Sequence, residues 1–530
     1  MRLYLCIRDK IKNPGKLIVL LNQILTLNQL FLFMFKKQLI IIFLFLFFIS
    51  YAQNEFVTIW KPNANGIIDH SINFGGTGTD YTIYWEEVGY PQHNGLMDAV
   101  TSNSNNPITI NFGPSLQADP LQATYEVKAS GGNGLFYGFR ANTGIMPPGG
   151  NQELIELSQW GNATWLQQFN RAFANCPNLN VTAADTPDMT QVTSLSQMFL
   201  NCSSLTGHTS FSYWNPYHIT DMSGMFSGAT LFNQNIGNWD TANVTNFSGM
   251  FASASSFNQD ISAWNTISGT DFSSMFSDAT AFNQPLNSWN TENATNFRYT
   301  FYNAAAFNQP LNNWNTGKVT DFEYMFENAV SFNQPIGNWD VSKVDYFAGF
   351  NMFAGALHFD QDISGWNIKL QNFSWDSIYF GFKNAGLSCT NYSNFLIALN
   401  NNPTWPNSTI TSGTIDATGL VYSTQQAMLA RAQLINKGFN IIGDSYISGC
   451  FLSTREVSAK TKTSAYPNPT TGVINVESSA DESVYLYDIN GNLIKNMLFR
   501  KGKNTIDLTE YPSGDYFLKG DNVFTKIIKQ

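Results

Sequence analysis

The stretch Val319-Thr-Asp-Phe-Glu-Tyr-Met-Phe-Glu-Asn-Ala329, followed by Phe332-Asn-Gln-Pro-Ile-Gly-Asn-Trp-Asp340, is one copy of a unit that recurs along the middle of the chain. Its tryptophan returns in five steps of 25 residues and one of 27, at positions 214, 239, 264, 289, 314, 339 and 366. A unit of this length cannot bury its aromatic side chains alone, whereas stacked units can bury them against one another. The period therefore predicts a stack of similar coils with one continuous core.

The spacing inside the unit favours a short helix followed by a short strand. Its apolar residues follow the order i, i+3, i+7 and i+10, which is one face of an α-helix: Val319, Phe322, Phe326 and Ala329. Pro335 then ends the helix, and residues 336–339 read as an extended piece. We expect an α/β solenoid of about nine coils over residues 156–385, resembling a leucine-rich repeat, with a short helix and a short strand in each coil.

One polar column, of asparagine, and one aromatic column, of tryptophan, run through the repeat. Asparagine, each time followed by Gln, falls at the turn of successive units, at positions 233, 258, 283, 308 and 333. We interpret this column as structural, because an amide at a buried turn satisfies backbone groups and links coils; calcium ligation would need more charge. The tryptophan column has two interpretations. It is either a buried core ladder, which the scarcity of aliphatic residues favours, or an exposed ladder of rings that stacks on sugars.

Segments without the repeat flank the array. Residues 53–155 contain four stretches that alternate apolar with polar residues between Gly-rich turn signals, which predicts a β-sandwich; the stretches are 58–60, 81–85, 108–112 and 123–128. Residues 446–463 read as a linker. Residues 464–530 alternate again around a hairpin signal and predict a second, small β-sandwich.

A cap is expected to close the C-terminal end of the solenoid over residues 386–445. Ser423, with Gln426 three residues later, predicts a capping box at the start of a helix over residues 425–436. Residues 439–442 then read as a strand. Such a cap is needed because the last coil of a solenoid otherwise leaves its apolar end open.

The N-terminus carries an export signal. A Lys-Lys pair precedes an apolar run, and Ser50-Tyr-Ala52 supplies the small residues of a cleavage site before Gln53. We expect residues 34–52 to be a signal peptide, and residues 1–33 to be either a misassigned start or part of an unusually long leader. The apolar run is too short for a comfortable membrane span, and no later stretch reaches that length, so an integral membrane protein is not expected.

Composition argues against several kinds of partner. Residues 1–52 hold 7 of the 28 basic and 1 of the 38 acidic residues, so the rest of the chain has 21 basic and 37 acidic residues and a net charge of −16. A polyanion of this size is a poor nucleic-acid binder, because phosphate neutralisation needs clustered Lys and Arg. The sequence has no CxxC or HExxH pattern, so neither a metal nor a cofactor is expected.

Four cysteines follow the leader, an even number that is typical of disulfide-bonded proteins outside the cell: Cys176, Cys202, Cys389 and Cys450. Cys176 and Cys202 each follow a repeat Phe by three residues, so we expect them on adjacent coils. Strand neighbours about 4.8 Å apart are within disulfide reach, whereas packed helices about 8–10 Å apart are not. The pairing of the four cysteines stays open.

The repeat, written Met-Phe-x-x-Ala-x-x-Phe-Asn-Gln-Pro-Leu-Asn-x-Trp-Asn, resembles the BspA-type leucine-rich-repeat surface proteins over residues 156–445. This resemblance implies surface exposure, an adhesion-like or protein-binding role and no enzymatic activity. Tyr81-Thr-Ile-Tyr-Trp85 resembles a PKD-like strand, although the acidic Gly-Asp-Gly that usually follows the Trp is absent.

The tail resembles the C-terminal sorting domain of type IX secretion substrates. The motifs that carry this resemblance are Tyr466-Pro-Asn-Pro469, Tyr487-Asp-Ile-Asn-Gly491, Tyr511-Pro-Ser-Gly-Asp-Tyr516, Lys526 and Lys529. The resemblance implies contact with the secretion machinery, export across the outer membrane, removal of the domain, and attachment to surface lipopolysaccharide or release.

We therefore expect a secreted protein at the outer cell surface that acts as a non-enzymatic adhesin or protein-binding scaffold. A surface glycan-binding protein that uses the aromatic ladder is the alternative. A surface hydrolase would need paired carboxylates at a break in the repeat. Asp360 and Asp362 flank the 27-residue step, but both replace residues of the Asn-Gln-Pro turn, so a catalytic site is not expected.

The candidate ligand face lies where the copies of the repeat differ most, at the two positions after a recurring Phe. Its members are Arg298, Tyr299, Glu323 and Tyr324. On the expected helix these side chains point away from the core, and the two tyrosines stack one coil apart. Aromatic and Arg side chains in one patch are typical of interface hot spots, while a solvated helix face with incidental drift is the alternative.

Overall fold

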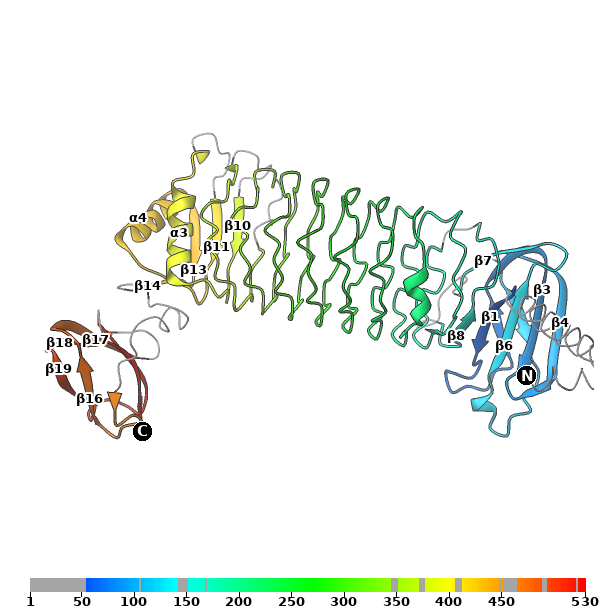
Figure 1. The fold of residues 1–530 in the computed structure, drawn as a ribbon, viewed down its shortest axis with the longest axis horizontal. Helices are drawn as coiled ribbons and strands as arrows, with labels where there is room; N and C mark the ends of the chain where they lie inside the picture. The colour runs from blue at the N-terminus through cyan, green and yellow to red at the C-terminus, as the bar shows by residue number, and fades with distance from the viewer. Residues whose placement is uncertain are drawn as a thin grey trace, which may run out of the picture. The chain divides into compact units, whose positions relative to one another are not determined.

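The computed structural model describes residues 54–103, 106–141, 151–166, 169–344, 351–370, 377–405, 412–447, 450, 465–488, 493–520 and 523–530 (Figure 1). The chain divides into two compact units. The first holds the residues up to 168 together with 178–192, and the second holds 169–177 together with 193–530. The expected leader, residues 1–52, lies outside the described residues.

The first unit is a β domain built on two sheets. A seven-stranded sheet has the order β4-β3-β6-β1-β8-β9 with β7 paired to β3, and β2 pairs with β5 in a second sheet. The elements are β1 (Phe56–Trp60), β2 (Ser71–Phe74), β3 (Gly76–Glu87), β4 (Tyr90–Ser102), β5 (Ile108–Asn111), η1 (Pro120–Gln122), β6 (Tyr125–Ser130), β7 (Leu135–Phe139), β8 (Leu154–Gln159) and β9 (Asn180–Val181). Aromatic rings join the sheets: Phe74 of β2 lies 6.3 Å from Trp60 and 5.4 Å from Phe139, measured between ring centroids.

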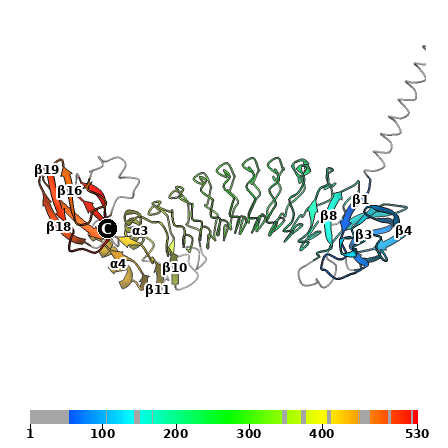
Figure 2. The ribbon, with the colours of Figure 1, turned by 90° about the horizontal axis from the view of Figure 1, so that it is seen from below.

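The coils of the second unit lack the expected helix, so the prediction of an α/β solenoid with a helix in each coil is wrong. The chain instead runs as successive β-turns, joined from coil to coil by isolated parallel bridges such as Asn246 with Asp271. Gly249 N donates to Ser273 O of the next coil, whereas Met250 N donates to Phe247 O of its own coil. A helix would use these N–H groups internally, so the turns release half of them to link coils. Figures 1 and 2 show these coils as parallel loops in green.

The apolar spacing predicted a helix wrongly, because consecutive β-turns place apolar residues at the same spacing as a helix does. Met325 N donates to Phe322 O, and Ala329 N donates to Phe326 O, so each three-residue step returns an apolar side chain to the interior. Tyr324 and Asn328 between them have positive φ angles of 59° and 56°, which an α-helix does not admit. A periodicity near three residues therefore identified the buried side correctly and the backbone conformation wrongly.

Aromatic columns fill the interior of the coils. The seven repeat tryptophans are at most 8% exposed, and consecutive rings from 214 to 339 lie 6.0–6.4 Å apart and nearly parallel. Each indole from Trp239 to Trp366 donates its Nε1–H to a carbonyl of the preceding coil, for example Trp289 to Ile261 O at 3.1 Å. The core interpretation of this column is confirmed, and the exposed sugar-stacking ladder is wrong.

The asparagine column links the coils along one edge. Asn283 Oδ1 accepts a hydrogen bond from Asn308 N at 2.9 Å and a second from Gln309 Nε2 at 3.0 Å. The same pair of bonds recurs at each step from Asn233 to Asn333. The structural interpretation of the Asn-Gln pair is thus confirmed, because the amide satisfies a turn N–H that the coil itself leaves free.

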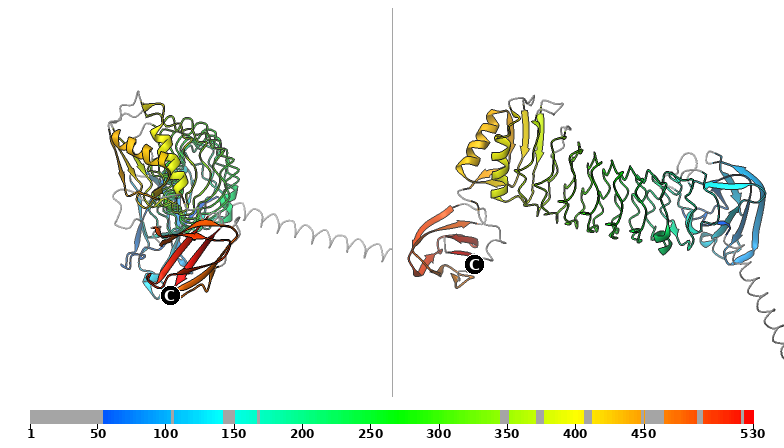
Figure 3. Two further views of the ribbon diagram at one scale, coloured as in Figure 1. Left: turned by 90° about the vertical axis from the view of Figure 1, so that its left-hand side faces the viewer. Right: turned by 45° about the horizontal axis from the view of Figure 1, so that its top comes forward.

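A helical cap follows the coils. Its parallel sheet has the order β10 (Ser377–Gly381), β11 (Ser412–Asp416), β13 (Phe439–Ile442), and β12 (Val421–Tyr422) pairs with β14 (Ser445–Tyr446). Among the described residues the α-helices are α3 (Cys389–Asn400) and α4 (Gln425–Asn436), and both belong to the cap. The 3₁₀ turn η2 (Thr209–Tyr213) lies earlier, in the coils. Figures 1 and 3 show α3 and α4, in yellow and orange, beside the sheet strands.

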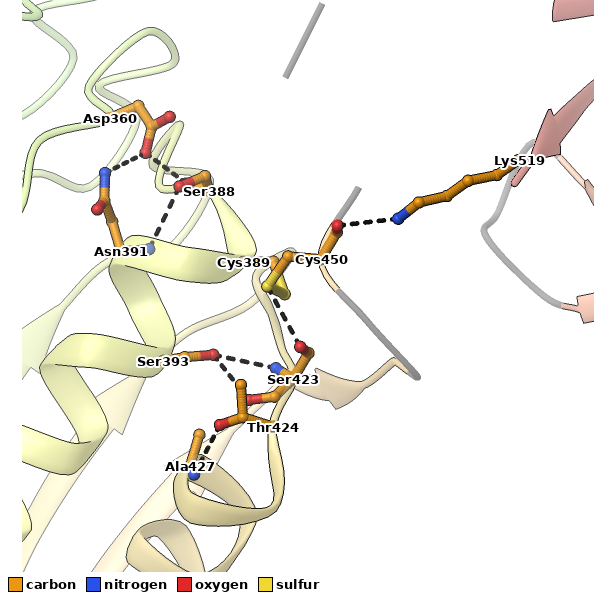
Figure 4. The surroundings of a disulfide bond; sticks show 10 residues. All are labelled: Asp360, Ser388, Cys389, Asn391, Ser393, Ser423, Thr424, Ala427, Cys450 and Lys519. Atoms are coloured by element: carbon orange, nitrogen blue, oxygen red, sulfur yellow. Dashed lines mark hydrogen bonds between the residues drawn. A yellow bond between two sulfur atoms is a disulfide. The ribbon is translucent and has the colours of Figure 1, made fainter. Parts of the chain in front are cut away.

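The sequence predicted helix α4 and strand β13 with the bounds observed, but it named the wrong capping residue. Thr424 Oγ1 accepts from Ala427 N at 3.1 Å and caps the helix. Ser423 is buried one residue earlier, where its N–H donates to Ser393 Oγ (Figure 4). The capping box favoured Ser423, because Gln426 follows it by three residues, but either hydroxyl can cap a helix and only the tertiary contact distinguishes them.

The C-terminal residues form a small domain of two antiparallel sheets. Their orders are β15-β16-β19 and β18-β17-β20-β21. The strands are β15 (Ala465–Tyr466), β16 (Val473–Ser478), β17 (Glu482–Asp488), β18 (Leu493–Phe499), β19 (Gly502–Asp507), β20 (Gly514–Lys519) and β21 (Phe524–Lys529). Side chains from both sheets form its core, including Ile474, Val484, Ile506 and Leu518.

Candidate ligand face of the coils

From residue 169 to residue 344, each coil carries two residues with left-handed backbone, four positions apart. The first of these positions is occupied by Arg171, Gln197, Gly224, Gly249, Ser274, Tyr299 and Tyr324, all with φ between 55° and 61°. Glycine adopts this conformation freely, whereas a side chain there costs roughly 1–2 kcal/mol because its Cβ crowds the following carbonyl. Two bulky tyrosines therefore occupy a position at which the three preceding coils carry Gly or Ser and the two coils before those carry Gln197 and Arg171.

The two tyrosines form a stack between adjacent coils. The ring centroids of Tyr299 and Tyr324 lie 4.8 Å apart with planes 14° apart. The Tyr302 ring meets Tyr299 edge-on at 5.3 Å and 81°. Both stacked residues are half-buried, so the cluster is held in place while part of it faces solvent.

Charged side chains surround this stack. The Arg298 guanidinium lies 5.1 Å from the Tyr299 ring centroid and pairs with Glu323 Oε2 at 2.7 Å. Asp321 Oδ2 lies 3.9 Å from the same guanidinium. Glu323 is buried, which raises the pKa of its carboxyl although Arg298 acts in the opposite direction. Arg298 is thus fixed by a desolvated carboxylate and an aromatic face rather than free in solvent.

The structure brings the four predicted face residues together, with two differences from the expectation. They lie on β-turns and not on a helix, and Glu323 points into the protein instead of towards solvent. Burial also raises the pKa of Glu327 one turn later, and the neighbouring Glu323 carboxylate adds to this. The face therefore combines exposed aromatic edges with carboxylates that are largely withdrawn from water.

Two further residues of the face were missed by the sequence reasoning. Tyr302 follows Tyr299 by three residues, so the i+3 step of the repeat could have found it. The Asn351 side chain forms a hydrogen bond with Tyr324. That contact could not have been found, because the 27-residue step shifts the register of the following coil.

Two of the four cysteines form a disulfide bond. Cys389, the first residue of α3, is bonded to Cys450 across 61 residues of sequence (Figure 4). Cys176 and Cys202 are buried thiols outside the disulfide, although the rings that precede them, Phe173 and Phe199, stack at 5.4 Å as expected for adjacent coils. Burial raises the pKa of Cys202 to about 12, which keeps it a neutral thiol.

The described residues carry no group of three or more His, Cys, Asp or Glu side chains arranged to hold a metal ion. Asp360 and Asp362 each have a hydrogen-bonding role in the fold. Asp360 Oδ1 accepts from Ser388 N and from Asn391 Nδ2, both at 2.7 Å, and Asp362 Oδ1 accepts from Ser364 N. The candidate cleavage site at Ala52 and Gln53 lies outside the described residues.

Comparison with known proteins gives two matches. A family model described as "Mycoplasma protein of unknown function, DUF285" matches residues 167–286, 206–312 and 270–384, which overlap across the coils. A model described as "Secretion system C-terminal sorting domain" matches residues 464–530. No curated protein and no solved structure matches the chain significantly. Neither match names the BspA-type leucine-rich-repeat proteins, so the resemblance to them stays a prediction.

The sorting-domain match covers the C-terminal β domain from end to end. It confirms the predicted type IX tail, and with it a repeat protein that is exported to the outer cell surface. Within the part of the chain that the structure describes, no helix has the length and apolar composition that a membrane span requires.

Proposed function

We propose that this exported repeat protein is a non-enzymatic surface protein that binds a protein ligand through the face formed by Arg298, Tyr299 and Tyr324. The observation that carries the proposal is the pair of stacked tyrosines in left-handed conformation. The left-handed backbone is unfavourable for a tyrosine, and such strain supports a functional role for what the two side chains contact. The desolvated ion pair of Arg298 with Glu323 holds the cluster ready for binding.

A protein ligand fits this face better than a sugar. A sugar-binding platform needs a free aromatic face, whereas the Tyr299 ring already contacts Arg298, Tyr302 and Tyr324. The tryptophans that a glycan ladder would use are buried in the core. Tyrosine and arginine edges that are half-buried and pre-organised are the composition of protein-binding hot spots.

A binding role without chemistry also agrees with the use of the carboxylates. Asp360 and Asp362, the acids at the break in the repeat, accept hydrogen bonds from the cap: Asp360 from Ser388 N and Asn391 Nδ2, and Asp362 from Asn394 Nδ2. General acid–base catalysis needs carboxyl groups available to a substrate, so these two residues support a structural and not a catalytic role.

The test uses the chain from Gln53 onward, applied to arrays of immobilised extracellular proteins and of glycans. We expect saturable binding to protein spots, weakened about tenfold in the Tyr299→Ser/Tyr324→Ser variant. Tyr213→Ser/Tyr217→Ser is the matched control, because both tyrosines are exposed on the coils away from this face. Binding to glycan spots alone would replace protein with glycan as the ligand class. Equal binding by the double variant would remove this face from the site.

A further inference from the structure

The loops at one end of the N-terminal β domain carry exposed apolar side chains. Strand register places the end of β1, the end of β3 and the start of β6 side by side, since Trp60 and Glu87 both pair with Tyr125. The loops 61–70, 88–89 and 112–124 therefore meet at this end, and residue 153 joins them because β8 begins opposite Trp60. Four large apolar residues in these loops are 49–66% exposed: Ile67, Ile68, Val88 and Leu116.

These loops are held rigidly by buried polar groups. Glu87, only 1% exposed, accepts hydrogen bonds from Leu116 N at 2.8 Å and Gln117 N at 2.9 Å. His93 contacts the same carboxylate through Nδ1 and Phe112 O through Nε2. Burial alone would raise the pKa of Glu87, but these hydrogen bonds outweigh it and hold the pKa below its usual value. The buried, charged carboxylate of Glu87 thus holds the loop that carries Leu116 in place.

A second buried group braces the other loop. Asn63, which is almost fully buried, donates from Nδ2 to Pro120 O at 2.6 Å and accepts from Asp69 N, so it joins loop 61–70 to loop 112–124. Ile67 N donates to Asn65 Oδ1 at 2.9 Å within a turn whose Gly66 has a φ of 77°. Ile67 and Ile68 therefore project from a fixed turn and not from a loose loop.

The charges around this apolar tip are mainly acidic. Among the described residues of these loops and the segment before β8, the carboxylates are Asp69, Asp119 and Glu153, against the single lysine Lys61. Anionic lipid headgroups would be repelled by this rim, whereas Lys and Arg side chains would be attracted to it. Rigid exposed apolar residues inside an acidic rim have the composition of a pre-organised protein-binding surface.

We propose that this loop end, formed by Ile67, Ile68, Val88 and Leu116, is a second binding site that takes a polypeptide segment with apolar side chains flanked by Lys or Arg. The apolar side chains of the partner pack on the tip, and its basic side chains pair with Asp69 and Asp119. The site is distinct from the tyrosine face of the coils, and it does not depend on that face binding anything.

The experiment selects ligands for the chain from Gln53 onward from a phage-displayed library of random dodecapeptides. We expect the enriched peptides to carry apolar residues flanked by Lys or Arg. Ile67→Ser/Ile68→Ser should weaken a selected, fluorescently labelled peptide about tenfold or more, and Leu116→Ser should do so to a similar degree while retaining the backbone bonds to Glu87. All three positions are exposed, so thermal melts of these variants should match that of the parent chain.

Two control variants show whether the loss of affinity is specific to this loop end. Leu96→Ser, at a similarly exposed leucine in the middle of β4, should leave the affinity within about twofold, as should Tyr299→Ser/Tyr324→Ser on the coils. Enriched peptides without basic residues, no enrichment at all, or equal affinity in the loop variants would each overturn the proposal. Sedimentation with phosphatidylcholine–phosphatidylglycerol vesicles that is lost in Ile67→Ser/Ile68→Ser would assign the tip to a lipid surface and would also overturn it.

Discussion

The ring of Tyr299 stacks on the ring of Tyr324 from the next coil, 4.8 Å away, and both residues have a left-handed backbone. The contact and the strain are coupled by the fold. The left-handed turn aims the side chain outward at the same place in each coil, and the coil spacing then brings successive side chains within stacking distance. A stabilising ring contact thus stands against an unfavourable backbone conformation at the same two residues.

The backbone strain at Tyr299 can be measured separately from the ring contact. Tyr299→Ala and Tyr299→Gly both remove the ring, but only glycine removes the Cβ that crowds the left-handed turn. We expect the glycine variant to be more stable than the alanine variant by about 0.5–1 kcal/mol in chemical denaturation. Ala252→Gly, at a position without positive φ, should instead lose a similar amount. A glycine variant no more stable than alanine would show that the turn is unstrained.

The tryptophan column should be the most sensitive part of the coils. Trp289→Ala removes a buried ring between Trp264 and Trp314, and should destabilise the protein by about 3–5 kcal/mol. Trp289→Phe keeps an aromatic ring but loses the bond to Ile261 O, and should cost less. Tyr213→Ala, at an exposed ring, should stay within about 0.5 kcal/mol of the parent. A loss of that small size in Trp289→Ala would contradict the core assignment.

The asparagine column predicts a difference between removing its acceptor oxygen and keeping it. Asn283→Ala leaves Asn308 N and Gln309 Nε2 without their acceptor and should cost about 1–3 kcal/mol of unfolding free energy. Asn283→Asp retains an acceptor oxygen and should cost clearly less, as the natural Asp360 suggests: at the corresponding position of a later coil, its Oδ1 accepts from Ser388 N. Equal losses in the two variants would show that the side-chain oxygen does not carry this link.

The raised pKa of Glu153 predicts that the stability of the N-terminal domain depends on pH. Burial, with a smaller contribution from Asp69, raises the pKa of Glu153 to about 7. The folded state then binds more protons than the unfolded state between pH 4.5 and 7, so stability should fall as pH rises through this window. The side chain is partly exposed, so the expected loss is only on the order of 1 kcal/mol. Glu153→Gln should flatten this slope in pH-dependent denaturation, whereas an unchanged slope would assign it to other groups.

Processing at both ends can be followed by mass spectrometry of the cell-surface fraction. We expect an N-terminus near Gln53, after removal of the predicted signal peptide, and no peptides beyond about residue 464, because the resemblance of the tail to type IX sorting domains implies its removal during export. The chain isolated from inside the cell supplies the control, since it should still contain tail peptides. Intact tail peptides on the surface protein would contradict removal of the domain.

The sequence by itself determined the period, the buried columns and the tail. A 25-residue repeat of Trp, Phe and Asn-Gln leaves stacking as the way to bury the rings, and helix α4 follows from local propensity and flanking Gly438. Only the tertiary structure decided the backbone of the coils. An apolar side chain every three or four residues suits a helix and a series of β-turns equally well. The choice depends on N–H groups finding carbonyls in the next coil.

Tertiary structure also decided where the candidate sites lie. The spacing of Tyr299 and Tyr324, one repeat apart, predicted that they stack. Their left-handed backbone and the burial of Glu323, however, depend on contacts between coils. The disulfide of Cys389 with Cys450 joins segments 61 residues apart, and no sequence spacing selects that pair over the stacked Cys176 and Cys202. Local patterns fix which residues are buried, whereas partners distant in sequence are chosen by the three-dimensional path of the chain.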